Sequence, residues 1–422
     1  IMDGLVGSEM CIRDSMKLCP DFLHSGPDVP WINPECTGIA NLPPRAHLHS
    51  FENEAQALDG DPEHSAYYQP LDGNWKFRLF PKPAVLEAEV ISQALNDSSW
   101  ESIEVPGNWT MQGHDRPHYT NVQMPFPDQP PNIPEDNPTG VYRTHFHLPE
   151  SWDQRRILIH FGGVESAFFV FCNGKRVGFA KDSRTAVEFD LTPMVQKGMN
   201  QISVVVIRWS DGSHLEDQDH WWMAGIHRGV YLRSTEKVYL EDVFAKTGLN
   251  EEMTEGHLEV QVRSGFDEGP KPGWIVESQL LDPSGSKMNQ HSVQQEIPLA
   301  EETRINLGHL VRFSIKVKNP DCWSSEIPNR YTLLVVLKDP KGHEVEWTSC
   351  RIGFRRVEIE NRQLLINRKP VLIQGVNRHE HDPVKGKTVS RESMIQDIRL
   401  MKQNHVNACL LYTSDAADDE LG

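Results

Sequence analysis

The sequence has few cysteines, and none of them form a close pair. The chain of 422 residues holds seven, and no two are separated by only two residues. Their odd number and wide spacing disfavour a disulfide framework or a zinc ribbon and favour a reducing compartment. We therefore expect a cytoplasmic protein.

Positive charge and long apolar runs are also scarce. Lys and Arg number 42 against 60 Asp and Glu, which gives a formal net charge of −18. Such a surface repels phosphate backbones and anionic lipids, so we expect no nucleic-acid partner and no membrane partner. The longest apolar runs, 167–172 and 202–207, fall far short of the roughly 18 residues that a membrane-spanning helix needs.

Both ends of the chain differ from the rest. Residues 1–15 have no hydrophobic periodicity, and residues 409–422 break the pattern that precedes them. Both segments resemble translated sequencing-adaptor reads, and ordinary disordered tails are the alternative. We leave both out of the fold prediction and expect the natural protein to extend further at both ends.

Most of the remaining chain is predicted to be β. In residues 16–238, apolar and polar residues alternate at 142–148, and the apolar run 167–172 ends at Asn173-Gly174, a strong hairpin signal. The proline-rich stretch 125–138 predicts a long loop, because proline disrupts regular structure. Many short strands with few helical patterns predict a jelly roll with an N-terminal arm.

Residues 239–354 predict a second β domain. Two similar turns, 282–285 and 339–342, each combine Asp, Pro and Gly between strand-like segments. These residue types favour tight turns, so each turn is expected to close a hairpin. About 100 residues of this kind predict an immunoglobulin-like sandwich.

The pattern changes in residues 355–408. The apolar run 371–376 predicts a buried strand, Ser390 is a predicted N-cap, and apolar residues from Met394 onward recur at helical spacing. A further strand is expected from 406. One strand–helix–strand unit cannot close a parallel sheet, so we expect part of a larger α/β domain.

Two segments hold the side chains that chemistry needs. Residues 208–228 contain four acidic residues, three histidines and three tryptophans, which suit sugar hydroxyls or a cation. A loop whose polar groups cap one another is the alternative.

Residues 375–383 place His379, Glu380 and His381 after a predicted strand, which suits substrate binding, acid–base work by Glu380 or a zinc site. The spacing is not HExxH and no third ligand is near, so a zinc site is disfavoured. The alternative to a functional role is a structural role at the rim of a barrel.

These segments together resemble the N-terminal part of the large β-galactosidases of glycoside hydrolase family 2. The resemblance covers residues 31–408 and is strongest at 42–46, 117–127, 209–228, 323–329 and 375–383. It implies a jelly-roll sugar-binding domain at 16–238, an immunoglobulin-like sandwich at 239–354 and the truncated start of a TIM (β/α)8 barrel at 355–408. The implied activity is the retaining hydrolysis of terminal β-D-galactose from β-galactosides such as lactose.

The resemblance also implies roles for three residues. Asn121 is similar to the family's substrate-binding Asn, Asp211 to its sugar- and sodium-binding Asp, and His379 to the His that contacts the galactosyl transition state. The family uses Mg²⁺ and Na⁺, and the whole enzyme is expected to be a homo-oligomer. Both catalytic glutamates and the magnesium ligands are expected beyond this chain, which is therefore expected to be inactive alone.

Two other functions stay open. A β-glucuronidase or β-mannosidase is one, because residues 224–228 resemble the glucuronidase pattern, although the longer segment 209–219 argues against it. A non-catalytic carbohydrate-binding module or accessory chain is the other.

Overall fold

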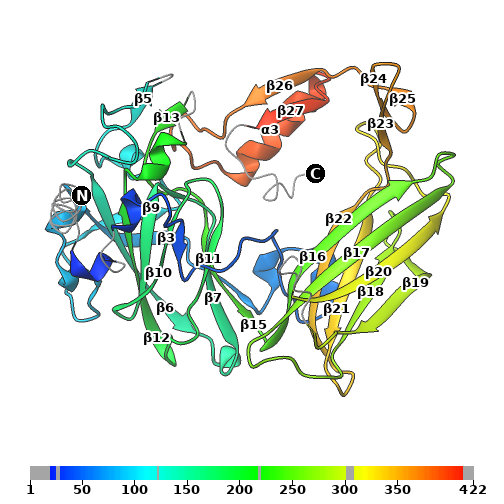
Figure 1. The fold of residues 1–422 in the computed structure, drawn as a ribbon, viewed down its shortest axis with the longest axis horizontal. Coiled ribbons are helices and arrows are strands. Elements are labelled where there is room, and N and C mark those ends of the chain that lie inside the picture. The colour runs from blue at the N-terminus through cyan, green and yellow to red at the C-terminus, as the bar shows by residue number, and fades with distance from the viewer. Residues whose placement is uncertain (1–19, 25–28, 121–122, 217–219, 301–307, 412–422) are drawn as a thin grey trace, which may run out of the picture.

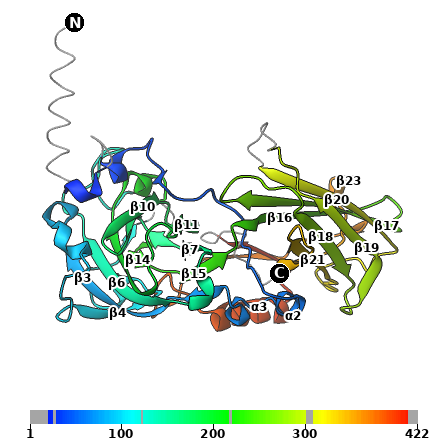
Figure 2. The ribbon, with the colours of Figure 1, turned by 90° about the horizontal axis from the view of Figure 1, so that it is seen from below.

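The computed structural model describes residues 20–24, 29–120, 123–216, 220–300 and 308–411, and it confirms a mainly β fold. Figure 1 shows two β units beside each other, with the C-terminal segment, orange to red, lying across one edge of both. Figure 2 shows the same two units from below, joined by the strand β16 (Val238–Leu249). No helix among the described residues is long and apolar enough to cross a membrane.

The first unit is a sandwich of two antiparallel sheets. The seven-stranded sheet has the order β1 (Gly38–Ile39), β10 (Lys175–Lys181), β9 (Ala167–Cys172), β12 (Gly198–Ile207), β6 (Thr139–Leu148), β3 (Gly73–Phe80), β4 (Glu101–Val105). The four-stranded sheet has the order β11 (Val187–Asp190), β7 (Arg156–Phe161), β15 (Val230–Thr235), β2 (Tyr68–Pro70).

Local sequence explains much of the first unit. The predicted hairpin forms at Asn173-Gly174, where both residues have positive φ and Lys175 pairs with Cys172. The proline-rich stretch is a loop, and β6 begins directly after it at Thr139. Side chains alternate between two cores: one lies between the sheets around Trp75 and Trp109, and the other covers the outer face around Phe169.

The second unit is also a sandwich. One sheet pairs β16 with β17 (Glu255–Phe266) and β20 (His309–Lys318). The other has the order β19 (Lys287–Glu296), β18 (Ile275–Leu281), β21 (Tyr331–Lys338), β22 (Glu344–Ile352). Both predicted turns close hairpins, between β18 and β19 and between β21 and β22. The short helix α2 (Glu54–Asp59) packs against β21 and β22.

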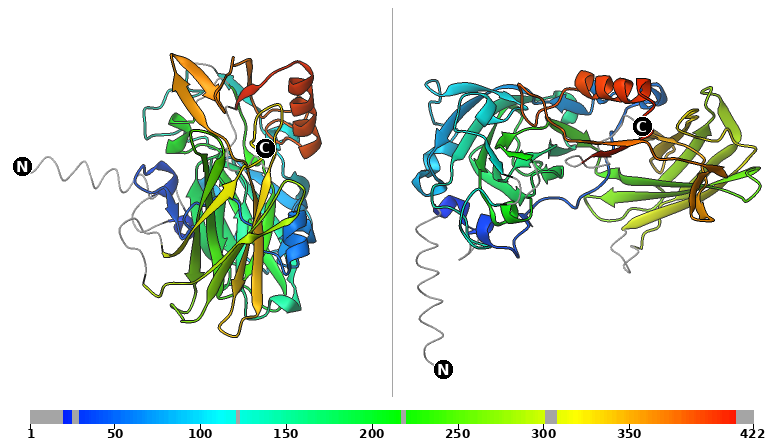
Figure 3. Two further views of the ribbon diagram at one scale, coloured as in Figure 1. Left: turned by 90° about the vertical axis from the view of Figure 1, so that its right-hand side faces the viewer. Right: turned by 90° about the horizontal axis from the view of Figure 1, so that it is seen from above.

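The C-terminal segment forms a three-stranded sheet and one strand–helix–strand unit. The sheet contains β23 (Val357–Glu360), β24 (Gln363–Ile366) and β25 (Lys369–Pro370). The strand β26 (Gly375–Arg378) runs parallel to β27 (Ala408–Leu411) and is joined to it through the helix α3 (Arg391–Gln403). The Ser390 side chain accepts a hydrogen bond from the Ser393 N–H, which confirms the predicted N-cap. Figure 3 shows α3 along the outside of the molecule.

One prediction for this segment is wrong. The strand begins at Gly375 rather than at 371, and Leu372, Ile373 and Val376 are exposed instead of buried. An apolar run predicts burial only where a second layer covers it. The only described partner strand of β26 is β27, and α3 contributes no buried residue.

Candidate functional site

The first unit carries a two-stranded ladder beside the segment that follows β26. β5 (His118–Thr120) pairs with β13 (His220–Trp222), and the Trp222 indole N–H donates to the Thr120 hydroxyl at 2.6 Å. Alternation along β13 buries His220 and Trp222 and leaves Trp221 exposed. Trp222 packs with Trp209 and Phe126, so the segment 208–228 is held by aromatic packing as well as by its polar groups.

Three imidazoles converge behind this ladder. The His220 ring centroid lies 5.0 Å from that of His379 and 5.1 Å from that of His381. The Trp221 N–H donates to His220 Nδ1 at 2.8 Å, so His220 is neutral and carries its proton on Nε2. Burial lowers the pKa of His220 to about 3, and the nearby Lys387 and Arg184 add to the effect.

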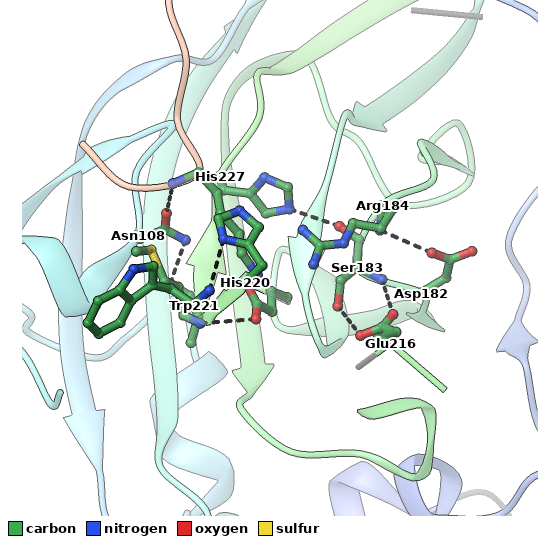
Figure 4. A network of polar contacts seen from close by, with 12 residues as sticks. Asn108, Asp182, Ser183, Arg184, Glu216, His220, Trp221 and His227 are labelled. Carbon is green, nitrogen blue, oxygen red and sulfur yellow. Dashed lines mark hydrogen bonds and ion pairs between the residues drawn. The ribbon is translucent and has the colours of Figure 1, made fainter. Parts of the chain in front are cut away.

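A network of polar contacts lies beside His220 (Figure 4). Glu216 accepts from the N–H and the hydroxyl of Ser183, both at 2.6 Å, and burial raises its pKa. His227 Nε2 lies 2.8 Å from the Ser183 carbonyl oxygen and so donates to it. Burial, followed by the Arg228 charge, lowers the pKa of His227 to about 3, so this ring is also neutral at pH 7.

Glu380 is engaged by two guanidinium groups. Its oxygens lie 3.2 Å from Arg228 Nη2 and 3.5 Å from Arg378 Nη1. Arg378 also contacts Asp397 of α3 at 2.8 Å. Glu380 therefore links the first unit to the strand–helix–strand unit, and nothing in these contacts favours the acid–base role that the sequence left open.

Asp211 lies in the short 3₁₀ turn that follows β12. Its two carboxylate oxygens accept from Lys181 Nζ at 2.7 and 2.8 Å, and both side chains are more than nine-tenths buried. Lys181 also donates to the Asn33 carbonyl at 2.9 Å. Because an ammonium group already neutralises this carboxylate, the arrangement fits a sodium ion poorly. The sodium role of Asp211 stays a prediction.

The three predicted site residues have different outcomes. His379 lies against His220, at the end of β26. Asn121 lies outside the described residues, directly after Thr120 of β5. The contacts of Asp211 and those of His379 run to different partners, so their convergence on one pocket remains a prediction. Among the residues that the structure describes, no group of three or more metal-binding side chains could hold a metal ion.

Sequence reasoning missed two features of the site. His220 belonged to a segment marked as rich in histidine, but no spacing joined it to His379. Lys387 and Glu165 had no sequence signal, because an isolated lysine and an isolated glutamate usually lie on the surface.

Comparison with known proteins places the chain in a family. Residues 68–236 match the sugar binding domain of glycosyl hydrolases family 2, and residues 238–355 match a second model described as glycosyl hydrolases family 2. Residues 357–413 match the TIM barrel domain of the same family. The chain belongs to glycosyl hydrolase family 2. The family resemblance found in the sequence is thereby confirmed.

Relatives of this family 2 chain include curated β-galactosidases. One from Psychromonas ingrahamii is 40% identical over 386 residues, which are 90% of this chain and 36% of that protein. One from Photobacterium profundum is 42% identical over 378 residues, again 90% of this chain and 36% of that protein. The chain thus spans about a third of the length of these relatives.

Two solved glycosidase structures share the fold. A β-glucuronidase 2 from Bacteroides uniformis has a TM-score of 0.67 at 21% identity, over 83% of this chain and 40% of that chain. A β-glycosidase from Bacteroides vulgatus has a TM-score of 0.64 at 23% identity, over 81% of this chain and 41% of that chain. At such identities the likeness concerns the fold alone.

Proposed function

We propose that this chain supplies the galactose-binding part of a retaining β-galactosidase that acts on terminal β-D-galactose in β-galactosides such as lactose. The observation that carries the proposal is the 40–42% identity to curated β-galactosidases across 90% of the chain. The neutral imidazoles beside β13 support it, because His220 keeps its Nε2–H as a donor and His227 keeps Nδ1 as an acceptor for polar groups of a ligand.

In this proposal His379 contacts the galactosyl group, and Asn121 and Asp211 bind its hydroxyl groups. His220 packs on His379 and, fixed as the Nε2–H tautomer, holds that ring in place. The Mg²⁺ requirement, the homo-oligomeric state and the cytoplasmic location are further proposals that rest on the family resemblance. Na⁺ is also implied by the resemblance, but it could bind at Asp211 only if Lys181 left that carboxylate.

Retaining hydrolysis requires two carboxyl groups about 5 Å apart, one as nucleophile and one as acid and base. The described carboxylates around the histidines are already engaged. Glu380 pairs with Arg228, Glu216 accepts from Ser183, and Glu165 pairs with Lys387. We therefore assign binding and orientation of the sugar to this chain, and bond cleavage to carboxyl groups from elsewhere in the enzyme.

Binding of a thio-β-galactoside, which resists hydrolysis, tests the proposal on the full chain. The histidine ring signals in ¹H–¹³C NMR are the readout, with His379→Gln as the variant. We expect the galactoside to shift the signals of His379 and His220 in the parent and to bind at least tenfold more weakly to the variant. No shift at millimolar ligand would contradict the proposal.

The same experiment examines the second candidate, a β-glucuronidase. The residues 224–228 favour it, and a thio-β-glucuronide is the matching ligand. A glucuronide carries a carboxylate that a galactoside lacks, so its binding requires an accessible cation. Preference for the glucuronide would replace the galactosidase proposal with this alternative.

A further inference from the structure

A buried ion pair joins the first unit to the loop that follows β26. Lys387 Nζ lies 2.9 Å from Glu165 Oε2, and each side chain is only 3% exposed. Glu165 ends the short strand β8 (Val164–Glu165), and its other oxygen accepts from the Met223 N–H at 3.1 Å. Both carboxylate oxygens are thus satisfied by groups that lie far from Glu165 in the sequence.

The backbone of the same loop is fastened to the first unit beside this pair. The Lys387 N–H donates to Asn108 Oδ1 at 2.8 Å, and Asn108 Nδ2 donates to the Ala224 carbonyl at 3.2 Å. The Thr388 hydroxyl donates to the His227 carbonyl at 3.2 Å. Asn108, which is labelled in Figure 4, is fully buried, so its amide bridges loop and domain without competition from water.

Gly386 shows how closely the loop approaches the domain. Its φ is +71°, and an added Cβ would lie 2.5 Å from the sulfur of Met223 and 2.8 Å from Asn108 Oδ1. Only glycine fits this approach without strain. At the other end of the loop, Glu380 contacts Arg228 at 3.2 Å. The stretch containing His379 and His381 is therefore fastened to the first unit at Glu380, between the two histidines, and at residues 386–388 on its C-terminal side.

We propose that Glu165 and Lys387 form a buried clamp through which the sugar-binding domain positions the loop bearing His379 and His381. The clamp makes these two histidines part of the first domain's site, although they belong to the barrel segment. Glu165 and Lys387 are positioning residues, because they act through the loop and not on the sugar. The functional part of this inference rests on the proposed role of His379.

The charge states suit a clamp at neutral pH. Burial lowers the pKa of Lys387 to about 8, so the ammonium group is still charged at pH 7. Burial acts to raise the pKa of Glu165, but Lys387, Arg184 and His227 outweigh it and lower that pKa to about 2. The titratable groups that act on one or both members of the pair are Arg184, Glu216, His220, His227 and His381.

Hydrogen exchange of the full chain, resolved for the peptide 382–389, tests the clamp. Removing one member leaves a buried charge without its partner, which is far more costly than removing both. We expect Glu165→Gln and Lys387→Met each to raise the opening of this loop by about 100-fold or more. The double variant should recover most of the protection.

Lys385 provides a matched control two residues away. It pairs with Glu104 at 3.6 Å, and the two side chains are 55% and 62% exposed. Exposed pairs of this kind contribute little, so Lys385→Met should change loop opening by less than about threefold. The control removes a lysine from the same loop without touching the buried pair.

A second measurement is needed to distinguish positioning of the loop from a general loss of stability. The ring signals of His379 and His220 in NMR respond to the mutual geometry of their rings. We expect both signals to shift in Glu165→Gln and to return toward their parent values in the double variant. The proposal would be overturned if both single variants kept the amide protection of the loop within threefold of the parent and left the His379 and His220 ring signals unshifted. Equal loss of protection throughout the first unit would overturn it as well, since the pair would then only stabilise the domain core.

The test separates this inference from the proposed function. If the parent chain fails to bind the thio-β-galactoside but the exchange and ring results hold, the galactosidase proposal fails and the clamp remains. If the sugar binds and the single variants leave loop and rings unchanged, the clamp fails alone.

Discussion

The two β units and the C-terminal segment differ sharply in how they bury apolar side chains. Each β unit closes a large core, built around Trp75 and Phe77 in the first and around Leu258 and Leu333 in the second. Over residues 357–411, by contrast, Ile359, Leu372 and Leu410 are more than half exposed, and α3 buries no residue. Antiparallel sandwiches complete their cores within one unit, whereas a parallel strand–helix–strand unit needs neighbouring strands and helices.

The largest expected effect comes from the core of the first unit. Phe169 is fully buried, and its ring centroid lies 4.6 Å from that of Phe179. Phe169→Ala should lower the unfolding free energy by about 3–5 kcal/mol, because it removes apolar contacts and leaves a cavity. Ile398→Ala in α3, where Ile398 is 36% exposed, should cost less than about 1 kcal/mol. Urea unfolding followed by tryptophan fluorescence compares the two, and similar losses would remove the distinction between core and segment.

Ion pairs should show the same contrast. Glu188 of β11 is buried and binds Arg233 at 2.8 Å and Arg45 at 2.9 Å. Glu188→Gln should cost about 3 kcal/mol, because two buried guanidinium groups lose their partner. The pair between Arg378 and Asp397 is half-exposed on the Asp side, so Asp397→Asn should cost less than about 1 kcal/mol.

The pH dependence of Glu188 follows from its surroundings. Burial acts to raise its pKa, but Arg233, Arg45 and His160 outweigh burial and hold that pKa well below the usual value. The unfolded chain therefore takes up this proton first as the pH falls. The contribution of Glu188 to stability should be complete above about pH 4.5 and decline at lower pH. The stability difference between parent and Glu188→Gln, measured by urea unfolding from pH 7 to pH 3, should shrink with acid; a constant difference would contradict the assignment.

A substitution of Asp211 tests whether this predicted site residue stabilises the first β unit. Because it neutralises the buried Lys181, Asp211→Asn should lower the unfolding free energy by about 1–3 kcal/mol. Asp153→Asn is the matched control, because Asp153 pairs with Lys197 at the surface. If Asp211→Asn leaves urea unfolding unchanged and weakens galactoside binding, Asp211 has a binding role in place of the structural one.

The smallest expected effect separates backbone strain from close packing. Gly386 and Gly342 both have positive φ, but an added Cβ meets no atom within 4 Å at Gly342. Gly342→Ala should cost about 1 kcal/mol from strain alone. Gly386→Ala should cost roughly 1 kcal/mol more in local stability, because Met223 and Asn108 must move. Hydrogen exchange around each glycine measures the difference, and equal effects would mean that the loop is not packed on the domain.

Part of the site followed from the sequence and part did not. His379 and the segment 208–228 stood out, because their residue types suit hydroxyl recognition. The contact between His379 and His220 carried no signal, since the two residues approach only when β13 and the end of β26 are brought together. The pairing of Asp211 with Lys181 also depends on the tertiary structure and had no sequence signal. Because Lys181 neutralises the Asp211 carboxylate, that group fits a sodium ion poorly.

Short-range chemistry in the sequence determined the strands, the hairpin at Asn173-Gly174 and the cap at Ser390. Each depends on backbone preferences and periodicity within a few residues, which persist whatever the rest of the chain does. Only the tertiary structure decided which charges became buried pairs and which apolar runs stayed exposed. Glu165 and Lys387 meet because the loop after β26 closes on the remote strand β8, and Leu372, Ile373 and Val376 stay exposed where no described layer covers them. Burial is a property of the assembled layers, so a sequence pattern can specify the face of a strand but not what will cover it.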